Sequence, residues 1–289
     1  MIYLILSVVS STVIFIVFKL YDRFKVDTFQ AIVVNYFTAC LCGILAYNAP
    51  IQPGEIAARE WFIYTVALGL LFITIFNLMA ITTQRSGLAV VSVATKMSLA
   101  IPIVFGLLYY GESLGILKFF GIVLALVAVY LSSIKKKSGL RIERRNLIFP
   151  LLVFLGSGII DTSIKFLEDS YVAANEVPIF SSAIFFSAAV AGILIMIFKA
   201  FKGKFKFEFK NVLGGIALGI PNYFSIYFLV KALRSDILES SGIFTVNNVA
   251  IVMLSTIVGI LLFKETLLRK NWLGILFAVI SIFLVAVNS

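Results

Sequence analysis

The sequence contains no histidine and only two cysteines, and these absences exclude several classes of chemistry. Cys-His and Ser-His-Asp catalysis both require a histidine base. A metal site built on the two cysteines would also need histidine to complete its ligands. Cys40 and Cys42 lie two residues apart within an apolar run, so they are interpreted as small core residues. We therefore expect no catalytic residue, no metal ion and no cofactor.

Charged side chains are also scarce, at 13% of the chain against 61% hydrophobic residues, and the mean hydropathy is +1.09. This composition excludes an ordinary soluble globular protein and indicates an integral membrane protein. The net charge of +10 would suggest nucleic-acid binding in a soluble protein, but here Lys and Arg lie in short loops between apolar runs. We therefore expect the lipid bilayer, and no nucleic acid, as the partner of these charges.

Ten apolar runs are each long enough for one membrane crossing, which takes about 20 residues. They do not alternate apolar and polar residues as the strands of a lipid-facing barrel would, so helices are expected. The sequence therefore predicts an all-α integral membrane protein with ten transmembrane helices. The predicted spans are residues 2–20, 28–47, 61–83, 87–110, 114–134, 147–167, 176–199, 211–233, 240–263 and 270–287.

Two stretches of the chain share the same spacing of a glutamate and a glycine. Glu112 precedes Gly121 by nine residues, and Glu265 precedes Gly274 by nine residues. A carboxylate at the start of an apolar helix satisfies unpaired N–H groups and favours the positive end of the helix dipole. Both glutamates are therefore interpreted as caps of the helices that follow them. The two glycines are interpreted as places where a neighbouring helix comes close.

This repeated spacing indicates an internal duplication of the chain. The longest polar stretch, a basic linker at residues 135–146, separates a first repeat at residues 1–134 from a second at residues 147–289. Because each repeat crosses the membrane five times, the second copy must enter it inverted relative to the first. Inverted repeats of this kind are common in transporters.

Ten spans in two halves, each with a glutamate ahead of a glycine-bearing final helix, resemble the EamA-like branch of the drug/metabolite transporter superfamily. A lysine near the end of the first helix of each half, Lys19 and Lys165, is a further part of the resemblance. The resemblance implies a secondary carrier of small organic solutes, often an exporter, that works by alternating access without ATP.

Two charged residues fall deep inside predicted spans. A Lys or Asp at the centre of a transmembrane helix is costly, on the order of 2.5–3.5 kcal/mol, so its presence needs a reason. Lys96 is about ten residues into its span and therefore close to the midplane, by a rise of ~1.5 Å per residue, and Asp161 is about fourteen residues into its own. We hypothesise that both face one aqueous cavity, where Lys96 pairs with a substrate carboxylate and Asp161 binds an amine or a proton. The alternative is a buried salt bridge that touches no substrate.

Several amide and tyrosine side chains are further candidates for lining a solute path. Buried amides in lipid require partners, either on other helices or in a wet cavity, and both alternatives stay open here. Asn248 corresponds to Thr95 in the first half, so the spans of Lys96 and Asn248 are predicted to meet at one level. The tyrosines share one helix face and suit either packing or an aromatic substrate. The full set is Asn77, Asn222, Tyr223, Tyr227, Asn247 and Asn248.

The function predicted from these residues is export of small metabolites such as amino acids, and proton coupling is one open mechanism. Multidrug efflux is the nearest alternative, because 28 Phe and 11 Tyr could hold lipophilic or cationic compounds. A membrane-embedded enzyme acting on lipids is an alternative of another class, but it would need a grouped reactive constellation. Monomer and homodimer both remain open.

The distribution of Lys and Arg predicts the orientation of the chain in a bacterial plasma membrane. Most lie in the loops that follow odd-numbered spans. The opposite side has few, namely Arg59, Lys118, Lys165, Lys231 and Arg234. Because positively charged loops stay in the cytoplasm, both termini are predicted to lie outside. A reporter active only in the cytoplasm should therefore be silent when fused to the C-terminus, and an active fusion would contradict this orientation.

Overall fold

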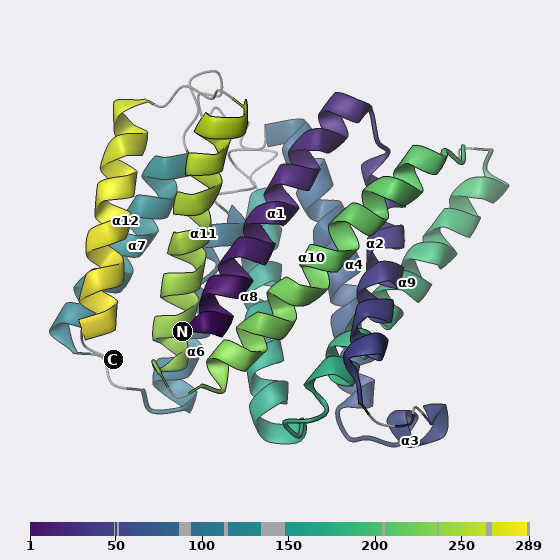
Figure 1. Cartoon of the computed structure of the whole chain (residues 1–289), viewed down its shortest axis with the longest axis horizontal. Helices are drawn as coiled ribbons and strands as arrows, with labels where there is room; N and C mark the ends of the chain where they lie inside the picture. The colour runs from purple at the N-terminus through teal and green to yellow at the C-terminus, as the bar shows by residue number, and fades with distance from the viewer. Residues whose placement is uncertain are drawn as a thin grey trace. The chain divides into compact units, whose positions relative to one another are not determined.

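A computed structural model describes residues 1–48, 50, 52–86, 94–112, 115–133, 148–203, 206–235, 237–263 and 268–287, and every regular secondary-structure element within these ranges is a helix. Figure 1 shows the helices with their labels. Their bounds are α1 Ile2–Phe24, α2 Thr28–Ala46, α3 Pro53–Ala57, α4 Phe62–Ser86, α6 Ala100–Tyr109, α7 Ile116–Ser133, α8 Ile148–Tyr171, α9 Val177–Phe201, α10 Phe209–Leu233, α11 Ser240–Phe263 and α12 Arg269–Val287.

Each predicted span overlaps one of these helices, and most boundaries agree within a few residues. At the fourth span, residues 87–93 lie outside the described ranges, and the described part is an apolar helical segment, Ala94–Tyr109. The short helix α3 was not predicted. Seven of the described helices are long and apolar enough to cross a membrane, and shorter apolar helices accompany them. The chain is therefore a multi-pass membrane protein, and the predicted inverted repeat stays a prediction.

The described helices form two compact units, and each unit draws on both halves of the sequence. Unit 1 combines Met1–Val8, Ile75–Thr162 and Lys231–Ser289, and unit 2 combines Val9–Thr74 and Ser163–Val230. The predicted basic linker, residues 135–146, lies outside the described residues. Lys96, Asp161, Asn247 and Asn248 therefore belong to unit 1, whereas Asn222, Tyr223 and Tyr227 belong to unit 2.

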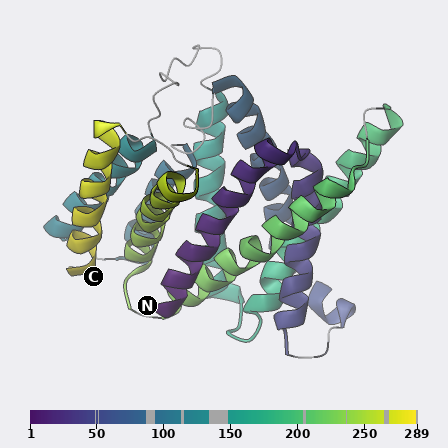
Figure 2. The same cartoon turned by 45° about the horizontal axis from the view of Figure 1, so that its top comes forward.

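Unit 1 is held together by close packing between α7 and α12, which lie side by side in Figure 1 and in the turned view of Figure 2. Gly121 makes this possible, because a Cβ added there would lie 2.8 Å from Val285 Cγ2. The Ser281 hydroxyl donates a 2.8 Å hydrogen bond to the Gly121 carbonyl across the same contact. The close helix approach expected at Gly121 is therefore observed. Its counterpart, Gly274, is buried in α12.

The packing of α11 completes unit 1, since this helix contacts α6, α7 and α12. One buried apolar cluster joins Ala125 and Val129 of α7 to Val249 and Val252 of α11 and Ala278 of α12. Small side chains dominate this cluster, so the helix backbones come close and gain dispersion contacts that lipid cannot replace. α11, which contains Asn247 and Asn248, is thus fixed on several sides.

Unit 2 is built around the packing of α2 on α9. Gly69 of α4 lies against Ser187 and Ala188 of α9, and a Cβ added there would be 2.7 Å from the Ala188 nitrogen. At the N-terminus of α9, the Glu176 carboxylate accepts a 3.0 Å hydrogen bond from the Trp61 indole N–H. It also forms an ion pair with Arg59, with 3.2 Å between the nitrogen and oxygen atoms. These contacts fix the start of α4 against the start of α9.

A substitution of Gly121 tests whether the α7–α12 contact stabilises unit 1. Gly121→Leu places side-chain atoms where Val285 and Leu284 now lie, so it should lower the stability by about 1–3 kcal/mol, as overpacking does. The measurement is the thermal unfolding midpoint of the detergent-purified protein. Gly54→Leu is the matched control, because a Cβ at Gly54 meets nothing within 4 Å. Equal midpoints for the two variants would contradict this packing account.

Candidate functional site

Lys96 lies beside an irregularity in its helix. Helical residues 94–97 are followed by a turn at Ser98 and Leu99, and α6 then continues from Ala100. Pro102 explains the turn, because proline has no N–H to donate to the carbonyl four residues earlier and its ring crowds that carbonyl. The Ser98 carbonyl instead accepts a 2.9 Å bond from the Ile101 N–H, three residues on. The backbone is therefore distorted one turn after Lys96.

The Lys96 ammonium has a defined partner on α11. Its Nζ donates a 3.2 Å hydrogen bond to Asn248 Oδ1. Asn248 Nδ2 in turn donates a 3.1 Å bond to the Phe244 carbonyl, one helical turn earlier. That second bond directs the amide oxygen toward the lysine, because an amide whose nitrogen is engaged presents its acceptor on the other side. The predicted meeting of these two spans is therefore observed.

Asp161 is brought to the same region by the close approach of α8 to α6. Gly158 makes this approach possible, because a Cβ added there would lie 2.7 Å from Ile101 Cβ. Asp161 follows Gly158 by three residues and so shares its helix face. The Asp161 carboxylate and the Lys96 ammonium interact electrostatically. Unit 1 thus gathers a cation, an anion and an oriented amide from three helices.

Asn247 and Asn77 complete the predicted residues of unit 1. Asn247 is 5% exposed, and its Oδ1 accepts no hydrogen bond from any side chain or backbone group that the structure describes. A buried carbonyl oxygen without a donor is costly, about 1–3 kcal/mol, so this position favours an additional donor such as water or a ligand. Asn77 is half-buried in the unit 1 part of α4.

The other predicted residues lie in unit 2 and form their own polar and aromatic cluster. Asn222 Nδ2 donates a 3.0 Å hydrogen bond to Asn35 Oδ1, and both amides are buried. Asn222 therefore has the interhelical partner that was one of its two alternatives. Tyr223 is fully buried and its ring stacks on Tyr227, with centroids 5.7 Å apart. No donor or acceptor among the described residues reaches the Tyr223 hydroxyl.

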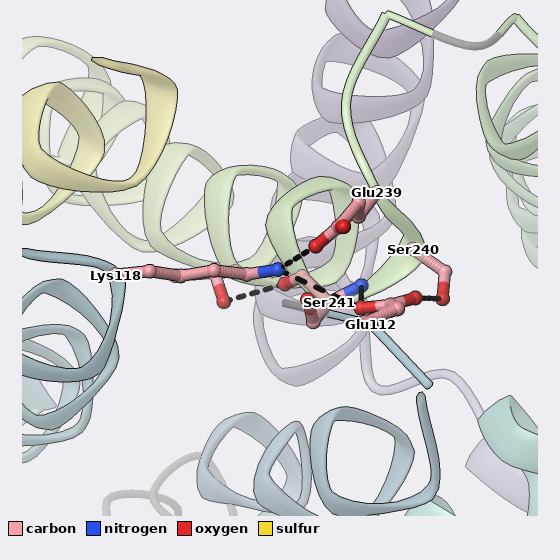
Figure 3. A network of polar contacts seen from close by, with 6 residues as sticks. Glu112, Lys118, Glu239, Ser240 and Ser241 are labelled. Atoms are coloured by element: carbon pink, nitrogen blue, oxygen red, sulfur yellow. Dashed lines mark hydrogen bonds and ion pairs between the residues drawn. The ribbon is translucent and has the colours of Figure 1, made fainter. Parts of the chain in front are cut away.

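Glu112 caps the start of α11, a helix of the other half of the sequence. Its carboxylate accepts a 3.1 Å hydrogen bond from the Ser241 N–H and a further bond from the Ser240 hydroxyl, both in the first turn of α11 (Figure 3). The interpretation of Glu112 as a cap of the helix that follows it stays a prediction, because residues 113–114 lie outside the described residues. The unpaired N–H groups that Glu112 satisfies belong to the second half of the chain. Its counterpart, Glu265, lies outside the described residues.

Lys118, which the sequence placed among the few cations of the side opposite the cytoplasm, joins the same network. It is fully buried in the first turn of α7, where its Nζ lies 3.7 Å from Glu112 Oε2 and also bonds the carboxylate of Glu239 (Figure 3). A fully buried lysine requires a polar partner, and the position of Lys118 inside the predicted fifth span was visible in the sequence. The sequence did not show which residue is the partner, because Glu239 lies 121 residues away from Lys118.

The two lysines of the family resemblance both lie in unit 2. Lys19 is half-buried in α1. Lys165 lies 3.6 Å from Glu168 and 3.5 Å from Asp169, one turn further along α8. Lys165 is therefore held by acids of its own helix. Over the residues that the structure describes, no group of three or more Cys, Asp or Glu side chains could hold a metal ion.

Substitution of Lys118 tests the network of Figure 3. Lys118→Met leaves the buried Glu112 carboxylate without its cation, so stability should fall by about 3–5 kcal/mol. The thermal unfolding midpoint reports the loss. Lys118→Met combined with Glu112→Gln should recover part of it, because the remaining buried group is then neutral. If the single variant unfolds at the wild-type temperature, the buried ion pair is not stabilising.

Comparisons with known proteins place the chain in a family. The EamA-like transporter family matches residues 1–134. An uncharacterized protein of Haemophilus influenzae is 30% identical over 285 residues, which cover 97% of this chain and 96% of that protein. A solved crystal structure matches with a TM-score of 0.80 at 11% identity, covering 99% of this chain and 96% of the other, and so shows the likeness of the fold. With a family match over the first half and a relative along nearly the whole length, the chain belongs to the EamA-like transporter family.

Proposed function

We propose that this protein is a secondary carrier that exports a small zwitterionic metabolite, such as an amino acid, by alternating access. Its family makes it a membrane transporter of the drug/metabolite type, and its helices make it a multi-pass membrane protein. The identity of the substrate, the direction of transport and the mechanism of alternating access are what we propose. Its localisation in a bacterial plasma membrane with both termini outside belongs to the same proposal.

The observation that carries the proposal is the arrangement of Lys96, Asn248 and Asp161 within unit 1. One contact of the Lys96 ammonium is its 3.2 Å hydrogen bond to the neutral amide of Asn248, and an amide leaves the lysine's positive charge in place. A substrate carboxylate would therefore gain a charge-assisted hydrogen bond from Lys96, and such bonds are about twice as strong as neutral ones. The substrate amine, or a proton, would bind at Asp161. Asn247 supplies a buried acceptor next to Asn248 in sequence.

Multidrug efflux is the second candidate, and the aromatic residues of α10 favour it. Tyr223 stacks on Tyr227 at 5.7 Å, and Phe224 stacks on Phe228 at 5.5 Å. Two stacked pairs along one helix suit flat, lipophilic or cationic compounds, which bind aromatic faces. This candidate does not require the charges of unit 1. A lipid-modifying enzyme, by contrast, has no supporting observation in the described residues.

Transport in proteoliposomes separates these candidates. Lys96→Gln and Asp161→Asn should each lower amino-acid transport about 10- to 100-fold, the loss expected for one charge-assisted hydrogen bond to the substrate. Asn248→Leu should lower it as well, because Lys96 then loses the amide that positions it. Lys270→Gln and Glu60→Gln are matched controls, since both residues are exposed and should leave transport unchanged.

The pattern of losses decides the outcome. If the three unit 1 variants fold and transport amino acids at the wild-type rate, the zwitterion proposal is wrong. If they still transport lipophilic cations while Tyr223→Leu and Tyr227→Leu do not, multidrug efflux is the function. If a pH gradient drives wild-type transport but no longer drives Asp161→Asn, then Asp161 is the proton-coupling residue.

A further inference from the structure

One end of unit 2 is a rigid frame built from four helix ends. The Tyr21 hydroxyl of α1 donates a 2.7 Å hydrogen bond to the Gly214 carbonyl of α10. Between α2 and α10, the Asn211 amide donates a 3.0 Å bond to Gln30 Oε1 and accepts a 2.9 Å bond from the Asp27 N–H. Gln30 also donates to the Lys206 carbonyl, on the segment that joins α9 to α10. The α1–α2 turn is thereby held against the ends of α9 and α10.

Four cations lie at these helix ends, of which Arg23, Lys25 and Lys202 are exposed and Lys199 is half-buried. The two lysines lie over aromatic rings, with Lys199 Nζ 3.7 Å from the Phe29 centroid and Lys202 Nζ 4.2 Å from the Phe198 centroid. A ring face attracts an ammonium through its quadrupole and does not neutralise it. These lysines are therefore positioned while their charge stays available to an anion.

The acids that the structure describes at this end are already engaged. Asp27 accepts a 2.9 Å bond from the Gln30 N–H as the N-cap of α2. Glu208 lies 2.7 Å from Lys210 and 3.7 Å from Lys206, and these two lysines lower its pKa by hydrogen bonding and charge. No ion pair with a described carboxylate involves Arg23, Lys25, Lys199 or Lys202. Even when the neighbouring acids Asp22 and Asp27 are counted against them, the four cations have an excess of positive charge.

Exposed phenylalanines lie on the same helix ends and connecting segments as the four cations. Phe24 is 61% exposed and Phe201 is 88% exposed, and Phe207 and Phe209 are similarly open. Rings exposed beside cations at the end of apolar helices are typical of the membrane–water interface, where the rings lie at headgroup depth. A soluble anion would gain nothing from these rings, whereas a phospholipid places acyl chains beside them and its phosphate beside the cations.

From this geometry we propose that Arg23, Lys25, Lys199 and Lys202 form a binding site for the phosphate group of an anionic phospholipid. We expect an anionic phospholipid rather than a zwitterionic one because of the net charge of the headgroup. A zwitterionic headgroup carries its own cation and gains little from four more, whereas an anionic headgroup complements them. The site lies in unit 2 and is independent of the transport chemistry proposed for Lys96 and Asp161.

The test compares phosphatidylglycerol with phosphatidylcholine on the detergent-purified full-length protein. Native mass spectrometry counts the bound lipids, and the thermal midpoint reports stabilisation by binding. Each lysine near an anionic surface contributes roughly fivefold, so K199Q/K202Q should bind phosphatidylglycerol about 25-fold more weakly than wild type. R269Q/K270Q removes the same charge from the exposed start of α12 and should retain wild-type binding. K199R/K202R keeps the charge and should retain it too.

Three outcomes would overturn the proposal. They are undiminished phosphatidylglycerol binding by K199Q/K202Q, an equal loss in R269Q/K270Q, or equal affinity of the wild type for the two lipids. The wild type supplies a check that needs no substitution: added salt should weaken phosphatidylglycerol binding, because exposed charges are screened. The midpoint of K199Q/K202Q in phosphatidylcholine should match that of wild type, which separates loss of binding from loss of folding.

Discussion

The presence of an ammonium group inside an apolar segment is the constraint on which unit 1 depends. Lys96 can stay there only if polar groups replace its water, and the structure supplies Asn248 at 3.2 Å together with the charge of Asp161. Asn248 is itself oriented by the Phe244 carbonyl. The same requirement applies at Lys118, where two carboxylates surround a fully buried ammonium.

Small backbone features bring these groups together. Gly158 lets α8 approach Ile101, so Asp161 arrives one turn later on the same face, and Pro102 interrupts the helix next to Lys96. Glu112 and Lys118 hold the first turn of α11 (Figure 3), and Asn248 lies eight residues further along that helix. The network at the start of α11 therefore also fixes the position along the helix axis at which Asn248 contacts Lys96. The same helix, α11, therefore carries both the stabilising network and Asn248 of the candidate site.

Hydropathy predicted nearly all of the helices, because membrane-crossing segments are set by length and apolar content. The duplication predicted that Asn248 and Lys96 lie at one level, and the hydrogen bond between them agrees. Tertiary partners were harder to predict. The cap that Glu112 provides for α11 was not predicted, and the partner of Lys118 was missed altogether. Both contacts depend on which helices pack together, and sequence spacing does not encode that. The placement of Asn222, Tyr223 and Tyr227 in unit 2 was missed for the same reason.

The central claim is that water reaches the buried polar groups of unit 1 from each side of the membrane in turn. The most direct measurement is labelling of Asn247→Cys, in a background where Cys40 and Cys42 are alanine, by a membrane-impermeant thiol reagent applied to either face of oriented vesicles. Asn247 is buried, with an acceptor that no described donor reaches, so a carrier that alternates should expose the new cysteine to both faces. Labelling from both sides is the predicted result, and labelling from neither side, or from one side under every condition, would contradict the account.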